Sequence, residues 1–257
     1  MTARCNPFSF TLLCLAALVA PMPLGALELP SPERSEEIID HVDRVLRGDS
    51  SRAEVELAVV TRRWERNMEL AIVSEGTDKA LVRVLAPRRE EGAATLKVGT
   101  DIWNYLPRAD RTVRVPSSMM MASWMGSHFT NDDLVQHSRM IRDYEIEATF
   151  AGERNGVELY EFSLTPREDA AVVWGGIELE VRAEDLVPLE SRYFGEDGEL
   201  RRTMEFSDFR EIGDRMVPTR MRLHPEDKPD EYTEMNYRSL EFDVEIAPGT
   251  FSLDALR

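Results

Sequence analysis

The sequence has few of the groups that carry covalent or metal chemistry. Its two cysteines, Cys5 and Cys14, both lie near the N-terminus, in a segment that we expect to be removed. A mature chain without cysteine has no disulfide, no thiolate nucleophile and no cysteine-ligated metal. The four histidines form no HExxH motif, and no GxSxG, P-loop or GxGxxG motif is present. We therefore predict a protein that is not an enzyme and that has no cofactor and no bound metal.

The N-terminal segment has the pattern of a secretory signal peptide. Arg4 supplies a positive start, residues 8–19 form an apolar run, and residues 21–26 give a breaker and small side chains. The apolar run is shorter than the roughly 20 residues that a membrane-spanning helix needs. We predict cleavage near Ala26 and export to the periplasm. Two leucines precede Cys14, instead of the small residues that a lipid-modified cysteine requires, so a soluble mature chain is favoured over a lipid-anchored one.

Two further absences narrow the class of protein. No apolar run after residue 26 approaches the roughly 20 residues of a transmembrane helix. Acidic residues outnumber basic residues. After removal of Arg4 the chain has 30 Lys and Arg against 48 Asp and Glu, which gives a net charge of about −18. An acidic surface repels nucleic acid and anionic lipid head groups. We therefore predict no nucleic-acid partner and no permanent membrane anchor.

Hydrophobic periodicity predicts one helix followed by many strands. Residues 32–47 have apolar residues at helical spacing, with Ser35 as the expected N-cap and Gly48 as the expected stop. From Ala53 onward the period becomes two, which indicates roughly eleven short strands joined mostly by hairpins. Without a βαβ rhythm the sheet should be antiparallel, and so many strands must curl or close. We predict a mainly β (α+β) fold in one domain over residues 27–257, with the few helices covering the concave apolar face.

The segment Val115 to Leu134, VPSSMMMASWMGSHFTNDDL, interrupts the strand pattern with apolar side chains. Methionine is unbranched and polarizable, so it adapts to irregular or changing apolar surfaces. Such a segment suits a lid over a hydrophobic cavity. A core helix packed on the sheet is the simpler interpretation and stays open at this point.

Acidic and histidine side chains gather at the end of this segment. His128, Asp132, Asp133 and His137 have side-chain types that suit zinc. Residues 130–133 also form an ordinary helix start, in which a cap is followed by carboxylates near the positive end of the helix dipole. The helix start is the interpretation that we favour.

Arginines flank the Met-rich segment and Trp64. They are Arg108, Arg111 and Arg114 before the segment, and Arg62, Arg63 and Arg66 around the tryptophan. One interpretation is a solvated strand face that balances nearby carboxylates. The other is a rim of guanidiniums beside an apolar cavity, which could bind a head group or a partner protein through paired hydrogen bonds.

Several motifs resemble those of a known family. They are WNYLPRADRTVRV (103–115), SWMGSHFTNDDL (123–134), FGEDGELRRTMEFSDFREIGDRMVPTRM (194–221) and FDVEIAPGTFSLDAL (242–256). Together they are similar to the LolA-like periplasmic carriers and, within them, to the outer-membrane lipoprotein-sorting family. The most specific pattern is Met-Gly-x-x-Phe-x-x-x-Asp-Leu from Met125. His128 stands where the family more often has Asp, which weakens any role tied to a carboxylate there.

The resemblance implies a fold, a cargo and partners. It implies an open half-barrel with helices packed into its concave side, and acyl chains of lipoproteins or lipids bound between sheet and helices. It also implies an inner-membrane transporter and an outer-membrane receptor as partners. The residues that we expect to form the cavity and its lid are Leu70, Trp103, Tyr105, Met119, Met120, Met121, Trp124, Met125, Phe129 and Phe206.

Pro116 and Gly126 flank the Met-rich segment and suggest how such a carrier would open. We expect residues 119–125 to fill the empty cavity and to swing out on Gly126 as a hinge when lipid enters. Two other functions remain possible. One is a sensory or accessory binding module of an envelope transporter, and the other is an enzyme acting on envelope lipids, for which His128 and its neighbours offer the one candidate group.

Overall fold

The structure is a computed structural model that describes residues 27–76, 78–136, 140–170 and 172–257. The expected signal peptide, residues 1–26, and His137 of the possible zinc cluster lie outside the described residues. In the part of the chain that the structure describes, no helix is long and apolar enough to cross a membrane.

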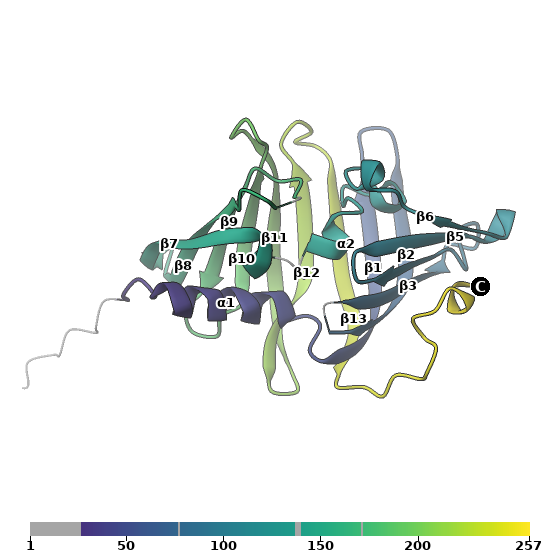
Figure 1. Cartoon of the computed structure of the whole chain (residues 1–257), viewed down its shortest axis with the longest axis horizontal. Helices are drawn as coiled ribbons and strands as arrows, with labels where there is room; N and C mark the ends of the chain where they lie inside the picture. The colour runs from purple at the N-terminus through teal and green to yellow at the C-terminus, as the bar shows by residue number, and fades with distance from the viewer. Residues whose placement is uncertain (1–26, 77, 137–139, 171) are drawn as a thin grey trace, which may run out of the picture.

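Thirteen strands form one antiparallel sheet within the described residues (Figure 1). The strand order is β6-β5-β4-β3-β2-β1-β13-β12-β11-β10-β9-β8-β7, so β1 pairs with β13 at the centre and every other neighbour is consecutive in the chain. The edge strands β6 and β7 do not pair with each other, so the sheet stays open. The prediction of a mostly β fold with an open antiparallel sheet is confirmed.

The strand bounds follow the period-two pattern of the sequence. The first six strands are β1 Ser50–Val60, β2 Glu65–Glu75, β3 Lys79–Ala86, β4 Ala94–Val98, β5 Asp101–Leu106 and β6 Arg111–Arg114. The others are β7 Tyr144–Arg154, β8 Val157–Pro166, β9 Gly176–Arg182, β10 Pro188–Phe194, β11 Leu200–Ile212, β12 Arg215–Pro225 and β13 Tyr232–Phe242. The periodicity did not predict β10, because a proline opens it and Glu190, Ser191 and Arg192 leave it little apolar alternation.

Strand β1 shows how alternation builds the main core. Val55, Leu57 and Val59 are at most 1% exposed and point to the same face of the sheet. In the register, Leu57 lies opposite Met68 of β2 and Met235 of β13, which are also buried. Burying a side chain of this size contributes roughly 1.5–3 kcal/mol. A one-residue slip would turn all of them to the other face, so the pattern also fixes the register.

A smaller core lies on the opposite face near the β3–β5 end of the sheet. Ala94 and Leu96 of β4 pack there with Trp103 and Tyr105 of β5 and with the C-terminal segment around Phe251 and Leu256. Thr95 and Lys97, which alternate with them on β4, line the cavity described below. The two faces of β4 therefore serve different cores.

The N-terminal helix α1 spans Pro32–Arg44 and packs against β7 and the short helix α3, Met140–Asp143 (Figure 1). Its N-cap is Ser31, whose Oγ accepts a hydrogen bond from the Arg34 N–H at 3.3 Å. The prediction of Ser35 as the cap is wrong, because proline fits the first helical position and moves the start forward. Gly48 ends the turn as predicted: its φ is +56° and its N–H bonds the Arg44 carbonyl at 3.0 Å.

The segment that precedes β7 is broken into short turns. It contains the 3-10 helices η2 Ser117–Met119 and η3 Trp124–Gly126 and the one-turn helix α2 Asp133–Gln136. Met125 and Gly126 both have positive φ, +49° and +71°, which stops any regular helix there. Two further 3-10 turns are η1 Pro107–Ala109 and η4 Asp254–Leu256. The alternative of one core helix over the Met-rich segment is therefore wrong.

Candidate functional site

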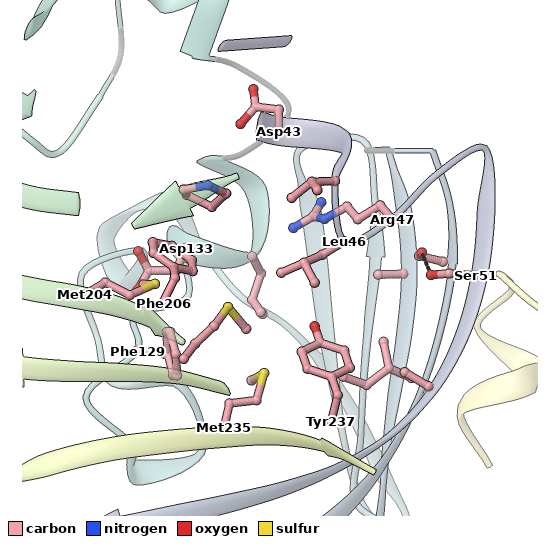
Figure 2. Close-up of a pocket in the computed structure, with 18 of the residues that line it drawn as sticks. Asp43, Leu46, Arg47, Ser51, Phe129, Asp133, Met204, Phe206, Met235 and Tyr237 are labelled. Carbon is pink, nitrogen blue, oxygen red and sulfur yellow. Dashed lines mark hydrogen bonds between the residues drawn. The ribbon is translucent and has the colours of Figure 1, made fainter. Parts of the chain in front are cut away.

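A cavity of about 180 Å³ lies within the main core, and side chains from both halves of the sheet line it (Figure 2). Nine strands contribute to the lining, β1–β4 and β9–β13, together with the end of α1, residues of the segment 124–134 and Met140. The lining is mostly apolar. Its larger apolar side chains are Leu46, Ile72, Trp124, Phe129, Leu134, Met140, Leu179, Met204, Phe206, Met221, Met235 and Leu240.

The cavity has an apolar end and a polar end. Figure 2 shows Met204, Phe206, Phe129 and Met235 on one side. On the other side, the Arg47 guanidinium points into the cavity. Lys97, Ser51, Ser74 and Tyr237 also line the cavity, and the two serine hydroxyls hydrogen-bond each other at 2.7 Å.

Burial changes the proton affinity of both cations. Loss of solvent lowers the pKa of Arg47, and the charge of Asp43 opposes this effect. Burial also lowers the pKa of Lys97, to about 7, and repulsion from Arg47 adds to the shift, whereas Asp78 and Asp43 oppose it. An ammonium group in this position is costly to charge, because the surrounding protein solvates it less well than water.

Trp124 attaches the Met-rich segment to the cavity wall. It is 2% exposed, and its Nε1–H donates a hydrogen bond to the Thr95 Oγ1 at 3.1 Å. Its backbone N–H bonds the Phe129 carbonyl at 2.8 Å, and Ser123 and Thr130 form an isolated antiparallel bridge beside it. The turn between Ser123 and Thr130 therefore presents an indole and a phenyl ring to the cavity.

A buried ion pair fixes the following residues. Both terminal nitrogens of Arg202, on β11, donate to the carboxylate oxygens of Asp133, one of them at 2.7 Å. The guanidinium also lies over the rings of Trp174 and Tyr193, at 4.2 and 4.3 Å from the ring centroids. Burial acts against both charges, yet the pairing overcomes it and keeps the pKa of Asp133 below its usual value. Thr130 caps the same carboxylate, with its N–H 2.7 Å from the Asp133 Oδ2.

His128 and Arg66 connect the segment to the sheet at its outer side. The His128 ring contacts the Thr233 Oγ1 at 2.8 Å, near the start of β13, and the Glu231 Oε2 at 3.2 Å, directly before that strand. Arg66 of β2 donates a hydrogen bond to the Met125 carbonyl. These contacts hold the turn from β2 and from the start of β13, the two strands that flank β1.

The possible zinc cluster is not assembled in the described residues. His128 faces Glu231 and Thr233, while Asp133 is bound to Arg202. Among the residues that the structure describes, no group of three His, Cys, Asp or Glu side chains could hold a metal ion.

The cavity brings together three of the ten residues predicted from the sequence to form it. Trp124, Phe129 and Phe206 line it. Leu70 is fully buried in the main core without lining the cavity. Trp103 and Tyr105 pack in the smaller core, because their register places them opposite Leu96 and Ala94 on the other face of the sheet.

The remaining predicted residues lie at the surface or near it. Met119 and Met121 are 49% and 52% exposed, and Met120 is partly buried. Met125 and Gly126 line a second pocket of about 350 Å³, in which Arg66 and Glu90 supply charged groups. The predicted contact arginines Arg108, Arg111 and Arg114 are exposed at the β5–β6 hairpin, and Arg114 pairs with Asp101. None of these residues lines the 180 Å³ cavity.

Sequence reasoning missed the polar end of the cavity. Burial of Lys97 could have been recognised from the sequence, because it lies in a short strand whose other residues are apolar or hydroxylated. The position of Arg47 in the cavity could not have been recognised, since arginine at the end of a helix is usually solvated. The methionines of β11, β12 and β13 could have been found from their inward positions in the alternation.

Comparisons with known proteins agree on the fold. The model of a protein family described only as "Uncharacterized protein" matches residues 76–257. A domain named as an outer membrane lipoprotein-sorting protein, from Vibrio parahaemolyticus, is 22% identical with a TM-score of 0.77, covering 88% of this chain and 99% of its own. A DUF1329 family protein from Desulfovibrio piger is 21% identical with a TM-score of 0.81, covering 89% and 100%.

A third solved structure is similar as well. It is a LolA superfamily protein from Nitrosomonas europaea, 20% identical with a TM-score of 0.72, and the match covers 86% of this chain and 98% of the other. None of the curated proteins matches the chain. At identities near 20% these likenesses establish the fold, and function has to be argued from the site.

Proposed function

Because the chain belongs to the DUF1329-like family of uncharacterized proteins and has the LolA-like fold of lipoprotein-sorting proteins, we propose that it binds acyl chains in its cavity as a carrier. The observation that supports this most is the methionine-rich apolar cavity between the sheet and the segment 124–134. Methionine and aromatic walls accept chains of differing shape, as a carrier requires.

The size of the cavity favours a movable cover. Small-molecule sites are usually about 300–1,000 Å³, whereas this cavity is about 180 Å³. An acyl chain could enter only if part of the lining moved outward. We propose that α1 and the segment 124–134 are the helical cover of the concave face and that this cover moves. Gly126 is the proposed hinge, since it and Met125 already adopt left-handed backbone conformations.

The energetics also require a cover that resists opening. Each buried methylene contributes about 0.8 kcal/mol, so a chain of about 16 carbons would gain roughly 13 kcal/mol before the costs of binding. That corresponds to nanomolar affinity or tighter. A carrier that binds so tightly could not release its cargo. The contacts of Trp124, Asp133 and Arg66 in the closed state would offset part of this gain and so permit release.

Location and partners follow from the same proposal. We propose that residues 1–26 are a signal peptide, that residues 27–257 act as one domain in the periplasm, and that the cargo moves toward the outer membrane. An inner-membrane transporter would supply the cargo and an outer-membrane receptor would accept it. In this scheme Arg108, Arg111 and Arg114 would contact a partner or a lipid head group, because all three are exposed on one hairpin.

A second candidate function is an accessory binding module that serves a transporter without carrying cargo. The observation that favours it is the apolar surface beside the same arginines: Leu106 and Val113 are 49% and 41% exposed. A hairpin with exposed apolar and cationic side chains is typical of a protein contact. The two functions differ in whether the cavity is occupied when the protein is isolated.

Hydrolytic chemistry at His128 is not favoured by the geometry. The His128 ring lies between Thr233 and Glu231, an arrangement that has the residue types of a nucleophile triad. However, Thr233 is fully buried, and its hydroxyl oxygen also accepts the His128 backbone N–H at 3.0 Å. A hydroxyl so placed cannot reach a substrate, so we assign this group to holding the turn.

Native mass spectrometry of protein isolated from the periplasm without detergent tests the proposal. We expect a co-purifying acylated molecule. The variant Met235→Trp should lower its occupancy by filling the cavity, while Leu85→Trp, at a position 42% exposed on β3, should not. A protein that stays free of ligand even after incubation with phospholipids and lipoproteins would support the accessory module instead.

A further inference from the structure

The cavity contains a positive charge that an uncharged acyl chain does not need. Arg47 follows α1, and Figure 2 shows its guanidinium pointing into the cavity above the Tyr237 hydroxyl. Within the described part of the chain this guanidinium forms no ion pair and no side-chain hydrogen bond. Asp43, one helical turn earlier, also lines the cavity, and its charge opposes the lowering of the Arg47 pKa.

Other polar groups converge on the same end from separate elements. Lys97 comes from β4, Ser51 from β1, Ser74 from β2 and Tyr237 from β13. Their N–H and O–H groups can donate more than one hydrogen bond to a single acceptor. One of the two serine hydroxyls is occupied by the hydrogen bond between them, which leaves the other serine O–H, the Tyr237 hydroxyl and the Lys97 amine as donors beside Arg47 in the lining. We interpret this end of the cavity as a site for an oxyanion.

Arg47 is partly buried, and a mostly apolar cavity solvates its guanidinium less well than water does. A buried charge costs free energy unless it is paired and hydrogen-bonded. The chain as a whole is strongly acidic, with a net charge of −17, so anions are repelled from its surface in general. An anion bound at the polar end would neutralise Arg47, whereas an uncharged ligand would leave its cost in place.

We propose that the cavity takes a single amphiphile with a carboxylate or phosphate head group, which Arg47 binds while the acyl chain lies along Phe129, Met204, Phe206 and Met235. This inference rests on the proposed acyl-binding function and narrows its cargo. Acyl groups joined to a protein through esters or amides carry no charge. The polar end therefore selects a free fatty acid or a phosphate-headed lipid over the acyl chains of a lipoprotein.

Binding measurements with matched ligands test the selection on the full mature protein after lipid removal. The probes are palmitate, hexadecyl phosphate and the uncharged methyl palmitate, with acetate and inorganic phosphate as competitors that lack a tail. We expect palmitate or hexadecyl phosphate to bind at least about tenfold more tightly than the methyl ester, because hydrogen bonds to charged groups are the stronger ones. Whichever charged probe binds more tightly identifies the head group.

Substitutions of Arg47 test whether this residue causes the preference for a charged head group. Arg47→Gln should remove the preference for the charged probe and leave methyl palmitate binding unchanged, and Arg47→Lys should restore part of the preference. Arg52→Gln is the matched control, since Arg52 is exposed on β1 five residues away in the sequence. Circular dichroism would verify that each variant is folded, and the comparison of acid with ester in the unmodified protein does not depend on any variant.

Every other result would contradict the inference, and each result would contradict a different part of it. Equal binding of palmitate, hexadecyl phosphate and methyl palmitate would refute the anionic selection and leave the acyl-binding function standing. A preference that survives in Arg47→Gln would refute the assignment to Arg47. Competition by inorganic phosphate as strong as by hexadecyl phosphate would point to a free anion site. If no probe binds, the proposed function fails together with this inference.

Discussion

The segment between Pro116 and Leu134 has a first half, residues 116–122, and a second half, residues 123–134, and the large apolar side chains of the two halves have opposite surroundings. Met119 and Met121 are 49% and 52% exposed, whereas Trp124 and Phe129 are 2% and 8% exposed. Apolar composition therefore does not decide which side chains of this segment are buried. The difference lies in how each half is attached to the sheet.

Only the second half has side chains that bond to the strands, among the residues described. Trp124 bonds Thr95 of β4, and Asp133 bonds Arg202 of β11. The first half is held from within the segment, since the Asn131 side-chain amide donates to the carbonyls of Met119 and Ala122 at 2.9 and 3.2 Å. The free energy that closes the cavity should therefore be concentrated in the second half, and substitutions should rank accordingly.

The largest effect is expected at the buried ion pair. Arg202→Met leaves the Asp133 carboxylate buried without its partner, which should lower the free energy of unfolding by about 3–5 kcal/mol. Urea denaturation measures this loss in the free energy of unfolding. The matched control is Arg201→Met, because Arg201 pairs with Asp197 at the surface, and such pairs contribute about 0–1 kcal/mol. Equal effects of the two substitutions would show that the ion pair does not hold the segment.

The next effect concerns the indole on the cavity wall. Trp124→Ala should lower the free energy of unfolding by about 3 kcal/mol, because it removes a buried ring and the bond to Thr95. Trp124→Phe keeps most of the ring and should cost about 1 kcal/mol for the lost hydrogen bond. Thermal unfolding of both variants separates packing from hydrogen bonding. If Trp124→Ala is as stable as the unmodified protein, the turn is not packed against the sheet.

A smaller effect is expected at Lys97, on the strand that Trp124 contacts. Its pKa is lowered to about 7 in the folded state, against about 10.4 when unfolded. Between these values the unfolded chain binds more protons, so the free energy of unfolding should rise with pH. The rise should be about 1–2 kcal/mol from pH 7 to pH 8.5.

Lys97→Met should flatten this rise, since methionine does not titrate. Lys79→Met, on the neighbouring strand β3, is the control, because the Lys79 side chain is 40% exposed. Urea denaturation at several pH values measures the slope for each variant. A slope that is unchanged in Lys97→Met would mean that the ammonium is not buried in the folded protein.

The smallest effect is expected in the first half of the segment. Met119→Ser and Met121→Ser change exposed side chains, so each should alter the free energy of unfolding by no more than about 0.5 kcal/mol. Thermal unfolding checks this. A loss comparable to that of Trp124→Ala would show that the exposed methionines are buried in solution, and the contrast between the two halves would disappear.

The sequence predicted the sheet better than the cavity. Alternation defines which strands exist and which side chains share a face, so most of the strands and the hairpin turn before Val157 were predictable. Alternation does not say which of two faces a strand turns toward a given core. Trp103 and Tyr105 were assigned to the cavity for that reason, although the register with β4 places them in the smaller core.

Two other features depended on contacts that sequence patterns do not encode. The Met-rich segment was expected to fill the cavity as a unit, but long-range bonds to Thr95 and Arg202 divide it. The cationic end needs Arg47 and Lys97 to meet across elements separated by 50 residues of sequence, which no local motif indicates. Tertiary packing decides both features.

The most direct test of the acyl-binding cavity is photo-cross-linking with a palmitate analogue that carries a diazirine at its methyl end, followed by peptide mapping. We expect adducts on the peptides that contain Phe129, Met204, Phe206 or Met235, and competition by unlabelled palmitate. Adducts confined to the exposed residues around Leu106, Met119 and Met121, or labelling that unlabelled palmitate does not reduce, would contradict it.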